Sequence, residues 1–145
     1  METRSIPEQQ GPTALQRPSF LLILVALIEL CAFEWVSRVR GFRYLRQWAY
    51  SRVRTNSAFA RTPVEQVTAA LDLAHILYPR TIACLQRSVV LTRMFRRIGL
   101  SPQIVIGVQR LPLRSHAWVE VDGAVIGEPQ RVRKSYRVLD RWDEK

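Results

Sequence analysis

The stretch that decides the fold runs from residue 84 to residue 126 and reads CLQRSVVLTRMFRRIGLSPQIVIGVQRLPLRSHAWVEVDGAVI. Its first part spaces apolar residues as one face of a helix does, which predicts a helix from Thr81 to Ile98. Gly99 and Pro102 end this helix, because neither residue continues a helix well. Cys84 then lies in the first turn and points toward the core. Three arginines fall roughly on the opposite face: Arg93, Arg96 and Arg97.

The second part of the stretch predicts an antiparallel sheet. β-Branched residues indicate strands at 103–108 and 117–121, and a last strand is expected at 136–139. Between them, Asp122-Gly123 is a strong hairpin turn signal, followed by a returning strand at 124–126. Helices first and an antiparallel sheet after them indicate an α+β domain.

The chain before residue 84 is expected to be helical. Residues 62–65 (TPVE) predict a helix start, with Thr62 as its cap and Pro63 at the first helical position. Residues 20–36 form a nearly continuous apolar run that approaches the ~20 residues of a membrane span. Glu29 and Glu34 interrupt the run, and a charge in hydrocarbon is costly. We therefore expect a helix buried against the domain, with Cys31 as a small buried residue, while membrane contact stays open.

Length and composition limit the remaining possibilities. The 145 residues suggest one domain, divided into a flexible tail at 1–18, a helical region at 19–61 and a core at 62–145. The net charge of +10 would suit nucleic acid, anionic lipid or an acidic peptide. Because the arginines are scattered and carry no recognised motif, we expect no nucleic-acid partner. The two cysteines form no metal or disulfide pattern, and no cleavable signal is recognised, so a cytoplasmic protein is expected.

Cys84 and His116 are the candidate catalytic pair. A cysteine attacks as the thiolate, which the partial positive charge at a helix N-terminus stabilises. His116 opens the strand that should pack against the cysteine helix. There an imidazole can accept the thiol proton and later protonate a leaving amine.

A carboxylate should orient the imidazole, and Glu128 is our choice. It lies directly opposite His116 if the hairpin has a three-residue turn with a bulge at Gly123, whereas a two-residue turn places it opposite residue 117. Asp122 sits at the turn, ~20 Å away at the rise of a strand. Glu120 shares the face of His116 but is two residue pairs away.

These motifs resemble the lasso peptide B protein family, which has a transglutaminase-like, papain-like core. The resemblance rests on residues 84–99, 104–108 and 116–123 and covers roughly residues 62–140. The family has a Cys-His-Asp triad, and the resemblance places Cys84 and His116 at the matching positions. The family's aspartate falls where this chain has Gly127-Glu128, so a glutamate with one more methylene takes its place.

The resemblance implies a cysteine peptidase that removes the leader from a ribosomally made lasso precursor peptide. A separate leader-recognition protein is implied, because the residues before 62 read as helices and not as a fused recognition domain. An asparagine-synthetase-like cyclase would then close the macrolactam, and no metal or cofactor is expected. Two alternatives remain: a transglutaminase-like acyl transferase, and a non-catalytic basic module that binds peptide or RNA.

Overall fold

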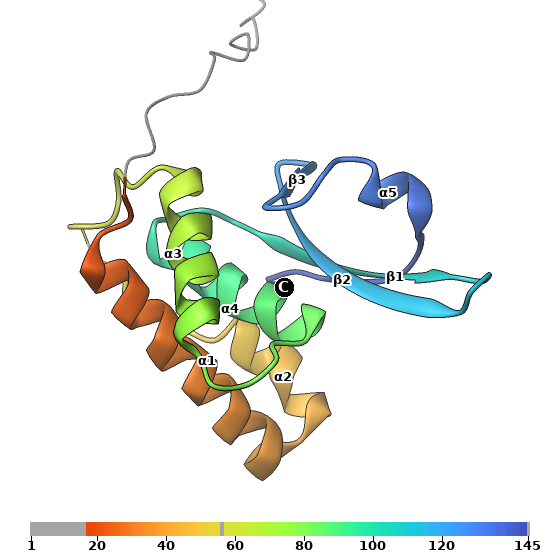
Figure 1. Ribbon diagram of the computed structural model, residues 1–145, viewed down its shortest axis with the longest axis horizontal. Coiled ribbons are helices and arrows are strands. Elements are labelled where there is room, and N and C mark those ends of the chain that lie inside the picture. Colours follow the sequence, from red (N-terminus) through yellow and green to blue (C-terminus); the bar gives the residue numbers. More distant parts are fainter. Residues whose placement is uncertain (1–16, 56, 145) are drawn as a thin grey trace, which may run out of the picture.

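The computed structural model describes residues 17–55 and 57–144, so most of the expected tail at 1–18 lies outside the described residues. Helices come first and a four-stranded antiparallel sheet follows, which confirms the α+β prediction (Figure 1). The elements are α1 (Phe20–Arg40), α2 (Phe42–Ala49), α3 (Val64–Leu77), α4 (Cys84–Arg97), β1 (Gln103–Gln109), β2 (Arg114–Val121), β3 (Ala124–Ile126), α5 (Val132–Ser135) and β4 (Arg137–Trp142).

The helix termini differ in detail from the prediction. Helix α4 begins at Cys84, with Ala83 as its N-cap and no capping side chain, so the cysteine is the first helical residue. Helix α3 begins at Val64 with Pro63 as its N-cap, again without a side-chain cap, so the predicted capping role of Thr62 is wrong. Gly99 follows α4 with a φ of 86°, a left-handed conformation that glycine adopts at little cost.

The strand order in the sheet is β3-β2-β1-β4, and every pair is antiparallel. The hairpin between β2 and β3 has a two-residue turn, because Val121 pairs with Ala124. Asp122 and Gly123 fill it with φ values of 49° and 78°, the positive pair that a type I′ turn requires. The three-residue turn with a bulge is therefore wrong.

The two faces of the sheet pack against different partners. Ile104 and Val119, which are cross-strand partners, belong to the main core with the buried residues of α1, α3 and α4. Val105 and Trp118, the next pair along, face the other way and form a smaller cluster with Val125. Val132 of α5 and Tyr136 cover this second cluster. The helices α1, α3 and α4 thus lie on one face of the sheet, and the α5 segment lies on the other (Figure 1).

Helix α1 packs against the domain as expected, but only one of its faces is buried. Leu22, Ala26 and Leu30 pack into the core, but Cys31 is exposed, so its predicted burial is wrong. Glu29, also on α1, is 3% exposed and forms an ion pair with Arg93 of α4 at 2.6 Å. Arg93 is therefore a buried residue, although its helix position predicted the outer face. The core crosses residue 61, and the division into regions 19–61 and 62–145 stays a prediction.

Candidate active site

The structure brings His116 and Glu128 together. Nε2 of His116 lies 2.6 Å from Oε2 of Glu128, a short distance typical of a charge-assisted hydrogen bond. His116 is the third residue of β2, and Glu128 lies in the segment between β3 and α5. Both side chains are partly shielded, at 23% and 22% exposure. The pair is thus sufficiently shielded from water to hold its geometry, and it is still accessible to a substrate.

Glu128 reaches His116 by a route that the hairpin pattern did not predict. The observed register pairs Val119 with Ile126, and its continuation would place residue 128 opposite Ala117. However, β3 ends at Ile126, and Gly127 has a φ of 74°. This left-handed residue turns the chain out of the strand direction, and Glu128 meets His116 from the bent segment.

The imidazole lies against two aromatic rings. Its centroid is 6.1 Å from that of Trp118, with the planes 23° apart, and 5.4 Å from that of Tyr136. Gly107 lies opposite His116 on β1, and a Cβ added there would approach Tyr136 Cβ to 2.8 Å and the Trp118 ring to 2.9 Å. Gly107 is required here because a larger residue would push these rings away from the histidine.

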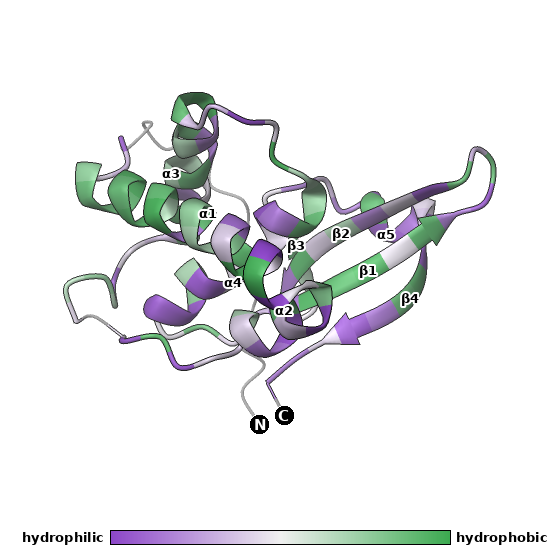
Figure 2. Ribbon diagram, turned by 90° about the horizontal axis from the view of Figure 1, so that it is seen from below, coloured by the Kyte–Doolittle hydropathy of each residue, from purple (hydrophilic) through white to green (hydrophobic). Residues whose placement is uncertain are grey.

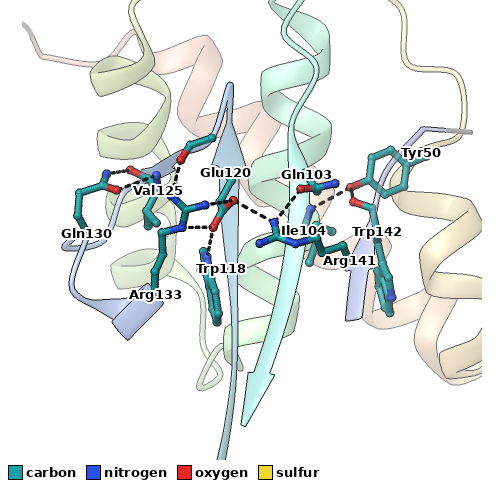
Figure 3. A network of polar contacts seen from close by, with 11 residues as sticks. Tyr50, Gln103, Ile104, Trp118, Glu120, Val125, Gln130, Arg133, Arg141 and Trp142 are labelled. Atoms are coloured by element: carbon teal, nitrogen blue, oxygen red, sulfur yellow. Dashed lines mark hydrogen bonds and ion pairs between the residues drawn. The ribbon is translucent and has the colours of Figure 1, made fainter. Parts of the chain in front are cut away.

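Trp118 is fixed in turn by a buried polar network around Glu120 (Figure 3). The indole Nε1 of Trp118 donates a hydrogen bond to Glu120 at 2.9 Å. Two arginines also contact the carboxylate, Arg133 of α5 at 3.0 Å and Arg141 of β4 at 3.1 Å. Glu120 is 3% exposed and its oxygens are engaged, so it anchors Trp118 and does not orient His116.

Cys84 is half-buried at the start of α4, where it is a free thiol. Within the part of the chain that the structure describes, its side chain makes no hydrogen bond, so contact between its Sγ and His116 stays a prediction. One observation links the two halves of the site. A Cβ at Gly127, next to Glu128, would lie 3.4 Å from the guanidinium of Arg87, one helical turn after Cys84. Gly127, the residue before Glu128, therefore lies close to the side chain of Arg87 on α4.

The pairing fixes which ring nitrogen is available for chemistry. An ionised carboxylate only accepts hydrogen bonds, so a neutral His116 keeps its proton on Nε2, facing Glu128. Nδ1 is then the basic nitrogen and is the atom that could take a proton from a thiol. This arrangement suits nucleophilic catalysis by a cysteine. Among the described residues, no group of three His, Cys, Asp or Glu side chains is placed to hold a metal ion.

The other sequence candidates lie elsewhere. Asp122 is exposed in the hairpin turn at the far end of β2. It lines a pocket of about 370 Å³ together with Tyr50, Arg96 and Glu144, away from His116. The other histidine of the sequence, His75, is exposed on α3 and was not a candidate for the site. Sequence reasoning missed the ring contacts of Tyr136 and the role of Gly107, and only the glycine inside a β-branched strand was a signal of close packing.

Comparisons with known proteins identify the family of the chain. A family model described as the transglutaminase-like superfamily matches residues 27–141. The microcin J25-processing protein McjB of Escherichia coli is 23% identical over 128 residues, which is 86% of this chain. The chain spans about 60% of the length of that relative. No solved structure matches the chain significantly.

Proposed function

The chain belongs to the transglutaminase-like superfamily, and from this premise we propose that it is a cysteine peptidase of lasso peptide maturation. Its substrate would be a ribosomally made precursor peptide, from which it removes the leader. The similarity to a microcin-processing protein supports this choice of substrate class. We further propose that it acts in the cytoplasm with a separate leader-recognition protein and an asparagine-synthetase-like cyclase.

In this proposal Cys84, His116 and Glu128 form a triad. Nδ1 of His116 takes the proton of the Cys84 thiol, and the thiolate attacks the carbonyl carbon at the leader–core junction. The tetrahedral intermediate collapses as the C–N bond breaks, and His116 returns the proton to the departing amine of the core peptide. Water, deprotonated by His116, then hydrolyses the thioester and releases the leader with a free carboxylate.

The hydrogen bond between His116 and Glu128 is the observation that carries this proposal. The bond supports an orientation and a tautomer of His116 that suit a catalytic base, and the sequence pattern had already made His116 the candidate base. The backbone N–H groups in the first turn of α4 add unpaired donors beside Cys84, which favour a thiolate and an oxyanion. Hydrogen bonds of catalytic residues are often long in substrate-free enzymes and tighten in the complex.

The test is a cleavage assay with the intact chain, the precursor peptide and the recognition protein encoded beside it. Mass spectrometry should show free leader and free core with the wild-type chain and neither with Cys84→Ala. A pull-down with the precursor should still capture Cys84→Ala, because the substitution removes the nucleophile and not the binding surface. Cys31→Ala is the matched control and should cleave normally. Leader release by Cys84→Ala would refute the nucleophile assignment.

The same assay separates hydrolysis from acyl transfer, the second reaction that these groups can perform. Both reactions pass through a thioester on Cys84 and differ in the group that resolves it. Water gives a leader whose mass ends in a carboxylic acid, whereas an amine gives a leader that has gained the mass of that amine and lost water. A product of the second kind would assign the chain to amide transfer.

A further inference from the structure

Helix α1 carries an exposed apolar surface that the proposed peptidase chemistry does not use. The helix has 21 residues and is long and apolar enough to cross a membrane by length and composition alone. From Phe20 to Trp35, every exposed position on it is apolar. These positions, which we name the α1 stripe, are Phe20, Leu21, Leu24, Ile28, Cys31 and Trp35. Their spacing of three and four residues places them along one line of the helix.

The two glutamates that interrupt the apolar run are both occupied by protein partners. Glu29 points into the protein, where it pairs with Arg93 and Arg97 of α4. Glu34 accepts a hydrogen bond from the Tyr78 hydroxyl and pairs with two arginines, Arg80 and Arg38. The bond from Tyr78, together with these two positive charges, lowers the pKa of Glu34. The α1 stripe itself therefore presents no charged group between Phe20 and Trp35.

The apolar surface extends from α1 to the neighbouring end of α3. Leu73, Ile76 and Leu77 are exposed there, and Tyr78 joins this end of α3 to Glu34 of α1. A groove of about 520 Å³ runs between them, mostly apolar and lined by Leu27, Cys31, Trp35, Tyr78 and Pro79 with Glu34, Arg38 and Arg80. Figure 2 shows the hydrophobic colouring along much of α1 and α3. Because two guanidinium groups share one carboxylate, the rim of the groove carries a net positive charge.

We propose that the α1 stripe binds the surface of an anionic lipid bilayer. A helix with apolar residues on all sides is normally shielded from water on all sides. Here the protein shields only one side of α1. The arginines at the rim and the net charge of +10 match a negatively charged surface. Trp35, exposed by 64%, is the residue type that is enriched where membrane meets water.

The structure favours a helix that lies on the bilayer over one that spans it. Leu22, Ala26 and Leu30 are buried in the protein core, and Glu29 forms its ion pairs on that same inner face. Spanning would pull this face out of the core and place the charged pair in hydrocarbon, where a charge is costly. Lying in the interface buries only the α1 stripe, while Arg38 extends its guanidinium to the headgroups.

Co-sedimentation of the full chain with vesicles tests the proposal. Vesicles of phosphatidylcholine with phosphatidylglycerol should pellet the protein, and vesicles of phosphatidylcholine alone should pellet less of it. Ile28→Glu, in the centre of the α1 stripe, should weaken partitioning about tenfold. Arg38→Gln should weaken it about fivefold on anionic vesicles only. Leu139→Glu makes the same change at a residue 63% exposed on β4, and should bind as the wild-type chain does.

A second measurement places no charge on α1. An environment-sensitive dye on Cys31, in the Cys84→Ala background, should shift its emission to the blue when anionic vesicles are added. The same dye on Leu139→Cys, with both native cysteines replaced, should not shift. Two outcomes overturn the proposal: equal binding by Ile28→Glu and Leu139→Glu, or no binding to either vesicle type. Self-association that Ile28→Glu abolishes, without vesicle binding, would assign the stripe to a second copy of the chain.

Discussion

Replacing Glu128 with glutamine tests the orientation of the catalytic base with the least change in shape. In the wild-type chain the carboxylate accepts the Nε2–H bond at 2.6 Å, so Nδ1 remains unprotonated. A glutamine amide can donate to Nε2 instead. The proton of His116 then moves to Nδ1, the nitrogen that has to accept the thiol proton. The substituted chain keeps its fold and holds the imidazole in the wrong tautomer.

The expected loss follows from what the carboxylate does in the two states. Loss of the orienting carboxylate in a triad costs up to about 10⁴-fold in rate, and we expect kcat/KM to fall by ~10²- to 10⁴-fold, equivalent to ~3–5 kcal/mol. The effect on stability should be much smaller. The two side chains are 23% and 22% exposed, and ion pairs with such access to solvent contribute about 1 kcal/mol or less.

The assay is leader release followed by mass spectrometry, alongside a thermal unfolding curve for each variant. Asp122→Asn makes the same chemical change at the exposed hairpin turn and should leave kcat/KM near the wild-type value. Glu128→Asp restores the charge and matches the family's aspartate, so it should recover part of the activity. If Glu128→Gln cleaves as fast as Asp122→Asn, the carboxylate does not set the tautomer and our reading of the pair is wrong.

Three further predictions address the framework of the site. Gly107→Ala should lower the free energy of unfolding by ~1–3 kcal/mol, since the added Cβ would lie 2.8 Å from Tyr136 Cβ and 2.9 Å from the Trp118 ring. An unchanged denaturation midpoint would contradict this close approach. Glu29→Gln should cost ~3–5 kcal/mol in urea unfolding, because it leaves the buried Arg93 without its counter-charge. Burial raises the pKa of Tyr50 from 10.0 to about 12, so stability is fully present below pH 10 and falls as pH rises through 12. Tyr50→Phe should flatten this alkaline fall, and identical pH profiles would refute the assignment.

The fold could be predicted because its main elements have strong local signals. The Asp122-Gly123 pair and the β-branched strands around it predict a hairpin, and Gly99 predicts the end of the preceding helix. The register within the hairpin could not be predicted in the same way. Two- and three-residue turns suit the same residues, and the choice of the longer turn depended on bringing Glu128 opposite His116. The chain achieves that contact with the left-handed bend at Gly127, and a lone glycine does not reveal its φ beforehand.

Periodicity also could not tell which faces of the helices are covered. Apolar residues occur on every side of helix α1. Its sequence pattern therefore does not distinguish the face that packs against the core from the face that does not. The apolar pattern therefore predicts Cys31 in the interior, whereas the structure has it exposed. The charge of Arg93 predicts an outer position, whereas the structure has it buried. An arginine is buried when a distant residue supplies the counter-charge, and a window of sequence around α4 does not contain Glu29, 64 residues earlier.

This distant pair shows how the N-terminal helices bear on the candidate site. Arg93 bonds Glu29 of α1, and it also donates hydrogen bonds to the backbone oxygen of Trp48 and the hydroxyl of Ser51, just after α2. One side chain of α4 thus connects this helix to both N-terminal helices. Cys84 is the first residue of the same rigid helix, so its position relative to the sheet follows from how α4 is held. The inner face of α1 therefore helps to place the proposed nucleophile, which leaves only its outer face free to bind a partner. The two roles proposed for this protein can coexist because they use opposite sides of one helix.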